Sequence, residues 1–183
     1  GSGSHSTLTR DDAETIEKEC SAVSAVAPIV NTAAQAVYGN QNWATGIYGT
    51  SPGILEVKDC ALVAGRNFTD QDIRSATKVC LLGQTVVDNL FGGIDPIGQI
   101  VRIKKVPFTV IGILETKGQS IIGQDQDDVI YIPVTTAQKK IVGTSTPGMV
   151  RVIMVKARSA EDMSLAEKQV TEVLRQRHRS GPN

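Results

Sequence analysis

The segment Gly93–Gly98 comes near to a known phosphate-binding motif. It has the two glycines of the G-x-x-x-x-G loop, but Gln99 and Ile100 stand where that loop needs Lys and then Ser or Thr. Pro96 also lacks the backbone N–H that could bind a phosphate oxygen. We therefore expect a structural turn here, with no nucleotide and no other cofactor.

Metal binding has two sets of candidate ligands. Asp125, Asp127 and Asp128 suggest a calcium loop, but the mid-loop glycine and distant Glu of the EF-hand are missing. We expect these three residues to form a solvated acidic loop. The three cysteines lack CxxC spacing, and His178 is the one histidine beyond residue 6, so we expect no metal site.

The cysteines are Cys20, Cys60 and Cys80. Their odd number, and the apolar segment around Cys80, predict reduced and at least partly buried thiols. A Cys20–Cys60 or a Cys60–Cys80 disulfide is the alternative.

A nucleophilic enzyme would need a hydroxyl with a base beside it. Ser120 and several threonines offer hydroxyls, but the candidate base, His178, follows Arg177 and precedes Arg179 at the end of a predicted helix. We therefore predict that this chain is not an enzyme.

The segment from Thr116 to Asp125 is a better candidate for function. It is long for a connection between two strands, and it places two isoleucines among polar residues. These isoleucines either contact a partner or fold back onto the core. The predicted partner-binding residues are Gly118, Gln119, Ser120, Ile121, Ile122, Gly123 and Gln124.

Length and charge narrow the choice of partner. The chain has 183 residues, and its 19 basic residues balance its 19 acidic ones. Such a balance argues against nucleic acid as a partner. Gly1–Ser6 reads as residual cloning sequence, and no apolar run is long enough to cross a bilayer.

The elements that would position these residues are centred on residues 78–133. We expect a strand at 78–83, a helix to Phe91, a hairpin of strands 99–104 and 107–114, and a strand at 129–133. Residues 108–114 are apolar on both faces, which is typical of a central strand.

The two ends of the chain add helices and strands. A capping box at Thr9–Asp12 predicts a helix over 10–19, and Thr69–Asp72 predicts a second short one. We expect separate strands at 23–30, 32–38 and 43–49, a helical turn from Ser51 to Leu55, a helix over 134–142 and a buried strand at 149–156. Apolar residues at three- and four-residue spacing predict a final helix, with Ser159 as its N-cap: Met163, Ala166, Val170, Val173 and Leu174.

Several motifs, in order, resemble the extracytoplasmic core domain of MacB-like and FtsX-like ABC transporter permeases. They are Leu62–Thr69 with its GR-x-F-T pattern, Leu82-Gly83, Leu90–Gly92, Asp95–Gly98, Pro107–Gly112 and Tyr131–Pro133. The Leu8–Asp11 opening and the Arg177-His178 ending extend the resemblance over nearly the whole chain. The chain departs from the family at the turn 104–106, where glycine is common.

The resemblance implies a mixed α/β (α+β) fold in two parts. A porter-like βαβ subdomain would comprise residues 7–64 and 149–183, and residues 65–148 would form a smaller inserted α/β subdomain. This division predicts that the strands at 108–114 and 149–155 do not share one continuous sheet.

The resemblance also implies a function without chemistry in this chain. The domain would lie on the periplasmic side of the bacterial inner membrane, in a dimeric, membrane-embedded permease. It would couple ATP-driven helix motion to efflux or lipoprotein export, with a periplasmic adaptor protein as partner and a cytoplasmic ATPase domain or subunit. A free-standing α/β ligand-binding domain is the alternative.

Overall fold

The computed structural model describes residues 7–143 and 148–179 as a mixture of helices and strands. The strands are β1 Val23–Tyr38, β2 Gln41–Thr50, β3 Leu62–Gly65, β4 Val79–Leu82, β5 Ile100–Ile103, β6 Val106–Leu114, β7 Val129–Pro133 and β8 Val152–Ala157. The helices are α1 Arg10–Glu19, α2 Ile54–Val57, α3 Asp70–Ser75, α4 Gln84–Leu90, α5 Val134–Thr136, a π-helix Ala137–Ile141, a 3-10 turn Ala160–Asp162 and α6 Met163–Arg179. The mixed fold class is confirmed.

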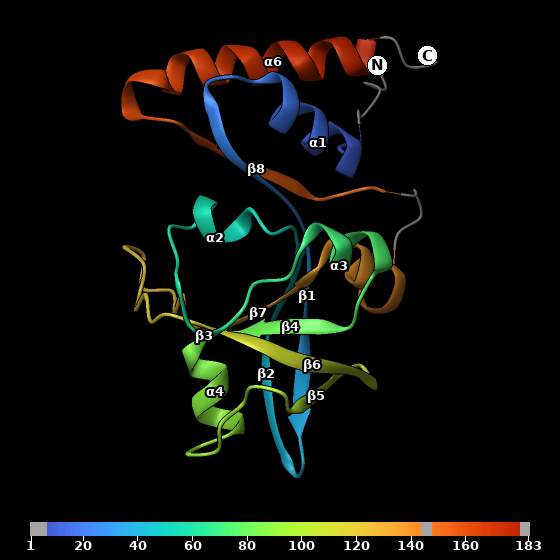
Figure 1. Ribbon diagram of the computed structural model, residues 1–183, viewed down its shortest axis with the longest axis vertical. Helices are drawn as coiled ribbons and strands as arrows, with labels where there is room; N and C mark the ends of the chain where they lie inside the picture. The colour runs from blue at the N-terminus through green and yellow to red at the C-terminus, as the bar shows by residue number, and fades with distance from the viewer. Residues whose placement is uncertain (1–6, 144–147, 180–183) are drawn as a thin grey trace.

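Strand β1 runs the length of the molecule and joins its two ends (Figure 1). Its first half pairs with β8, from Val23 to Ile29, and its second half pairs with β2, from Val30 to Tyr38. The predicted break near Asn31 is therefore wrong. The polar residues from Asn31 onward remain in the strand because β2 supplies backbone partners throughout that stretch.

The hydrogen-bonded strand order is β2-β7-β4-β6-β5-β1-β8, with β3 added beside β6 and with β1 also paired to β2. Strand β6 pairs with β3, β4 and β5, which confirms that it is central. Strand β8 is an edge strand whose residues are half-buried or exposed, so the prediction of a buried strand there is wrong. Its apolar residues are covered on one side by α1 and α6 and remain partly open elsewhere.

The expectation that β6 and β8 lie outside one continuous sheet is also wrong. They belong to one order, with β5 and β1 between them, because β1 is long enough to pair at both ends. Pairing also crosses the predicted boundary after residue 64, since β2 lies parallel to β7. The division into 7–64 with 149–183 and 65–148 stays a prediction.

The buried apolar side chains form clusters that follow this geometry. At one end, α1, the start of β1, β8 and α6 enclose a cluster centred on Ile16, Val26 and Val173. At the other end, β4, β6, β7 and α4 enclose a larger cluster that contains Leu82, Phe108 and further strand residues. A third cluster around Phe68 and Leu81 lies beneath α2.

Local signals explain where several elements begin. The Thr9 and Thr69 side chains each accept a hydrogen bond from the backbone amide three residues later. In return, the carboxylates of Asp12 and Asp72 accept from the backbone amides of the two threonines, so both predicted capping boxes are confirmed. Ser159 precedes the 3-10 turn as its N-cap, and its carbonyl accepts from the Asp162 amide. Its side chain accepts from no helix amide, and its hydroxyl donates to the Asp162 carboxylate instead.

The connection between β5 and β6 is a two-residue turn made by Lys104 and Lys105. Both residues have positive φ angles, 49° and 69°. Two-residue hairpins need this left-handed backbone, and glycine or asparagine adopts it at lower cost than lysine. The turn therefore carries local strain that the pairing of Ile103 with Val106 holds in place.

The predicted helix over 134–142 is present, but it changes type after one turn. The Thr135 and Thr136 hydroxyls donate to the carbonyls of Ile73 and Thr77, and the chain then continues as the π-helix. The predicted linker at 143–148 lies largely outside the described residues. No helix among the described residues is long and apolar enough to span a membrane.

Candidate functional site

The predicted partner-binding loop, residues 118–124, projects from the side of the molecule between β6 and β7 (Figure 1). Ile121 and Ile122 are 106% and 79% exposed. The alternative in which they fold back onto the core is therefore wrong for this structure. Two adjacent, fully displayed isoleucines are unusual, because burying each one would be favourable by ~1.5–3 kcal/mol.

Asp127 supports the base of this loop. Its side chain is 6% exposed, and its two carboxylate oxygens accept from the backbone N–H groups of Lys117 and Gly118, at 2.7 and 3.0 Å. The prediction of a solvated acidic loop is therefore wrong at this residue. The carboxylate is buried because it satisfies amides that the loop leaves without backbone partners.

The other two carboxylates also act as structural acceptors. Asp125 accepts from the Thr85 hydroxyl at 2.7 Å and from the Asp127 amide at 2.9 Å. Asp128 accepts from the Trp43 indole at 2.9 Å and from the Thr45 hydroxyl at 2.7 Å. Together they tie the loop to α4 and to β2, so the two isoleucines extend from an anchored base. Among residues 7–143 and 148–179, no group of three or more His, Cys, Asp or Glu is arranged to hold a metal ion.

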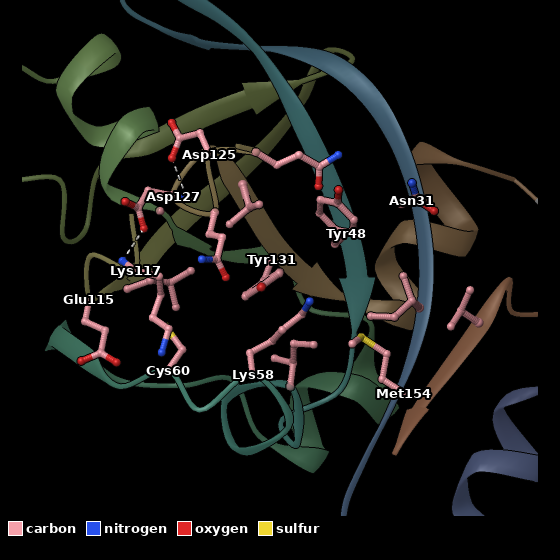
Figure 2. A pocket seen from close by; sticks show the side chains of 18 of the residues that line it. Asn31, Tyr48, Lys58, Cys60, Glu115, Lys117, Asp125, Asp127, Tyr131 and Met154 are labelled. Atoms are coloured by element: carbon pink, nitrogen blue, oxygen red, sulfur yellow. Dashed lines mark hydrogen bonds between the residues drawn. The ribbon is translucent and has the colours of Figure 1, made fainter. Parts of the chain in front are cut away.

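A cavity of about 320 Å³ opens beside the base of the loop (Figure 2). Its walls come from β1, β2, α2, the end of β6, the loop itself, β7 and β8. The lining is largely apolar, with Ile29, Ile54, Leu114, Val152 and Met154, and it also includes Tyr48, Tyr131 and charged side chains. Such a volume lies at the small end of the range for ligand pockets, roughly 300–1,000 Å³.

Tyr48 and Tyr131 are brought together by the parallel pairing of β2 and β7. They occupy the same register, and their ring centroids are 6.2 Å apart in an edge-to-face arrangement. Burial raises the pKa of Tyr131 to about 12, so its hydroxyl is protonated at neutral pH. Sequence reasoning missed this pair because residues 83 positions apart carry no local signal of pairing.

Cys60 also lines the cavity and is half-buried, whereas Cys20 and Cys80 are buried. The predicted burial is confirmed, and all three cysteines are free. Burial raises the pKa of the Cys60 thiol, and the carboxylate of Glu115 raises it further.

The remaining residues with candidate chemistry have structural roles. In the segment Gly93–Gly98, the Gly98 amide donates to the Val110 carbonyl and the Ile97 amide donates to the Asp95 side chain. These amides are used within the protein, which confirms a structural turn. His178 lies 3.0 Å from the buried Asp12 carboxylate, beside the Arg177 ion pair that joins α6 to α1.

Known proteins with similar sequences give a consistent result. The MacB-like periplasmic core domain family matches residues 1–173. The chain is 49% identical over 146 residues to the macrolide export ATP-binding/permease protein MacB of Syntrophobacter fumaroxidans, covering 79% of this chain and 20% of that protein. It is 37% identical over 179 residues to the MacB of Chlorobium luteolum, covering 98% of this chain and 26% of that protein.

Solved structures agree with the sequence comparison. The periplasmic region of MacB from Actinobacillus actinomycetemcomitans superposes with a TM-score of 0.79 at 28% identity, covering 95% of this chain and 76% of that one. The extracellular domain of the transporter YknZ from Gram-positive bacteria shares the fold, with a TM-score of 0.76 at 21% identity, covering 96% and 86%. The chain spans 20% and 26% of the length of the two curated relatives above. It belongs to the MacB-like periplasmic core domain family, on the periplasmic side of the inner membrane as part of an ABC transporter permease.

Proposed function

We propose that this domain transmits ATP-driven motion of membrane helices to a periplasmic partner, and that the loop 118–124 contacts that partner. The isolated domain would be non-enzymatic. In a full-length, dimeric transporter, nucleotide hydrolysis would belong to a cytoplasmic domain or subunit. The names of the MacB relatives support this separation of nucleotide hydrolysis from the periplasmic domain, because they describe proteins with both ATP-binding and permease parts.

The observation that carries the proposal is the display of Ile121 and Ile122 on an anchored loop. The Ser120 amide donates to the Gln124 carbonyl, and the Ser120 hydroxyl accepts from the Gln124 amide, so the loop tip is closed on itself. A preordered loop loses less conformational entropy on binding than a flexible one. Apolar side chains held in this way suit a protein partner, such as a periplasmic adaptor.

Mechanical coupling needs a contact that differs between two states of the transporter. The central strand β6 cannot supply it, because Phe108 and Val110 are buried. The loop 118–124 can supply such a contact, because it projects from the strands. Strand β1 connects these strands to the end of the molecule that holds α1 and α6.

The test replaces Ile121 and Ile122 by Ser in the full-length transporter. We expect weaker association with the adaptor, by ~2 kcal/mol or more for the pair, and reduced transport with cytoplasmic ATP binding unchanged. A matched control is Ile94→Ser, which removes an isoleucine that is 52% exposed in a different loop.

The melting temperature of the isolated domain separates a contact from a folding defect. Because neither isoleucine is buried, the double variant should melt within ~2 °C of the parent domain. Normal transport and normal adaptor binding by the double variant would show that the loop is not the contact.

A further inference from the structure

Several polar donors that line the cavity beside the loop make no hydrogen bond to any of the residues that the structure describes. Among the described residues, no hydrogen bond or ion pair engages the side chains of Tyr48, Lys58, Tyr131 or Arg151, all of which line it. Figure 2 shows the Lys58 side chain extending toward Tyr131, below Tyr48. Two hydroxyl donors and two cations therefore border one largely apolar space.

The acidic residues of the cavity are less available. All four carboxylate oxygens of Asp125 and Asp127 already accept hydrogen bonds, from Thr85 and from three backbone amides. Glu115 points away from the two tyrosines (Figure 2). The third cation, Lys117, donates to the neutral carbonyl of Asp59, so its charge has no carboxylate partner within the described residues.

The apolar side chains that line the cavity also restrict which ligands it can bind. The buried side chains of Ile54 and Leu114 line the cavity together with Met154 and Val152 of β8. A hydrated inorganic anion would leave this wall uncovered, whereas an alkyl or aryl group would bury it. A purely apolar molecule would leave the donors without acceptors when water is displaced.

We propose that this cavity binds an amphipathic organic anion, with its carboxylate or similar group held by Lys58, Arg151 and a tyrosine hydroxyl and its apolar part against Met154 and Leu114. Such a ligand would contact β8 on one side and the residues at the base of the loop 118–124 on the other. This inference stands independently of the proposed partner contact, because it depends on different side chains.

Decanoate is a suitable probe, since it combines a ten-carbon chain with one carboxylate. Titration of the isotope-labelled domain, followed by amide chemical shifts, should move the signals of Tyr48, Tyr131 and Met154 saturably. Decyltrimethylammonium, with the same chain and opposite charge, should bind at least tenfold more weakly, and acetate should not saturate.

Substitutions of the two cations test the anion site directly. Lys58 and Arg151 are exposed and lack side-chain partners in the described residues, so Lys58→Gln and Arg151→Gln should leave the fold unchanged. We expect each to weaken decanoate binding by about threefold to tenfold, the effect of losing one partly exposed charged contact. Lys168→Gln, on the exposed face of α6, is the matched control and should change nothing.

Three results would overturn the proposal. They are the absence of saturable binding at millimolar decanoate, equal affinity for decyltrimethylammonium, and unchanged decanoate affinity in the variant that carries both cation substitutions.

Discussion

Asp12 joins the two ends of the chain, and its replacement by Ala gives a sharp test of the fold. The carboxylate is buried at the start of α1, where it accepts from the Thr9 amide at 3.0 Å as part of the capping box. It also accepts from Arg177 of α6 at 2.6 Å and lies 3.0 Å from His178. One side chain therefore caps one helix and fixes a second.

The expected cost follows from these contacts. Loss of the cap costs ~1 kcal/mol. A hydrogen bond between charged groups contributes ~1.5–3 kcal/mol when buried, and the Arg177 side chain is 36% exposed, so solvent screening reduces this to ~1 kcal/mol. We expect Asp12→Ala to lower the free energy of unfolding by ~2 kcal/mol, or roughly 4–8 °C in melting temperature for a chain of this size.

The assay is urea and thermal unfolding of the purified domain at neutral pH. Asp11→Ala is the matched control, because Asp11 is exposed in the same first turn and should contribute at most ~0.5 kcal/mol through the helix dipole. In a double-mutant cycle, Asp12→Ala and Arg177→Ala should be coupled by ~1 kcal/mol. Equal destabilisation by the Asp11 and Asp12 substitutions, or additive effects in the cycle, would refute this reasoning.

The pH dependence has a definite sign. Burial alone would raise the pKa of the Asp12 carboxyl, but hydrogen bonds from Arg177, the Thr9 amide and His178 outweigh burial and hold the pKa below its ordinary value of 3.8. A carboxyl whose pKa is lowered by folding stabilises the fold fully when the pH is above the pKa of that carboxyl in the unfolded chain. This stabilisation is lost as the pH falls through the pKa of the carboxyl in the folded protein. The stability difference between the parent chain and Asp12→Ala should therefore shrink below pH 3.8.

Three further results are expected. Lys105→Gly should raise the stability by ~0.5–1 kcal/mol in urea unfolding, because glycine adopts the positive φ of 69° without strain; a lower stability would mean that the turn is unstrained. Alkylation of the native domain should modify Cys60 first and Cys80 only on unfolding, since burial raises the pKa of the Cys80 thiol; equal rates in mass spectrometry would contradict the burial. Calorimetric titration with ATP should give no saturable heat, because the Gly98 amide is already bonded to Val110; micromolar binding would show that the turn opens.

The sequence by itself determined the features that depend on neighbouring residues. The Thr9–Asp12 and Thr69–Asp72 boxes place helix starts correctly, since donor and acceptor are three residues apart. The Gly and Pro positions bound the strand–helix–hairpin series of residues 78–133 within a few residues of the observed ends. The exposed position of Ile121 and Ile122 was one of two readings that the local sequence allowed.

The tertiary structure alone decided how distant segments meet. The residues next to Asn31 do not predict that β1 continues through this position. The strands that pair with β1 and stabilise it are β2, β5 and β8, and all three come from other parts of the chain. The sequence predicted a solvated acidic loop because the side chains that bond to these carboxylates lie far away along the chain. Asp128 accepts from Trp43 and Thr45, and Asp125 accepts from Thr85. The cavity also depends on segments that are distant in sequence. Tyr48 contacts Tyr131 there because β2 pairs in parallel with β7. Caps and turns are set by energies between near neighbours, whereas strand pairing and burial are set by which surfaces the whole chain can bring together.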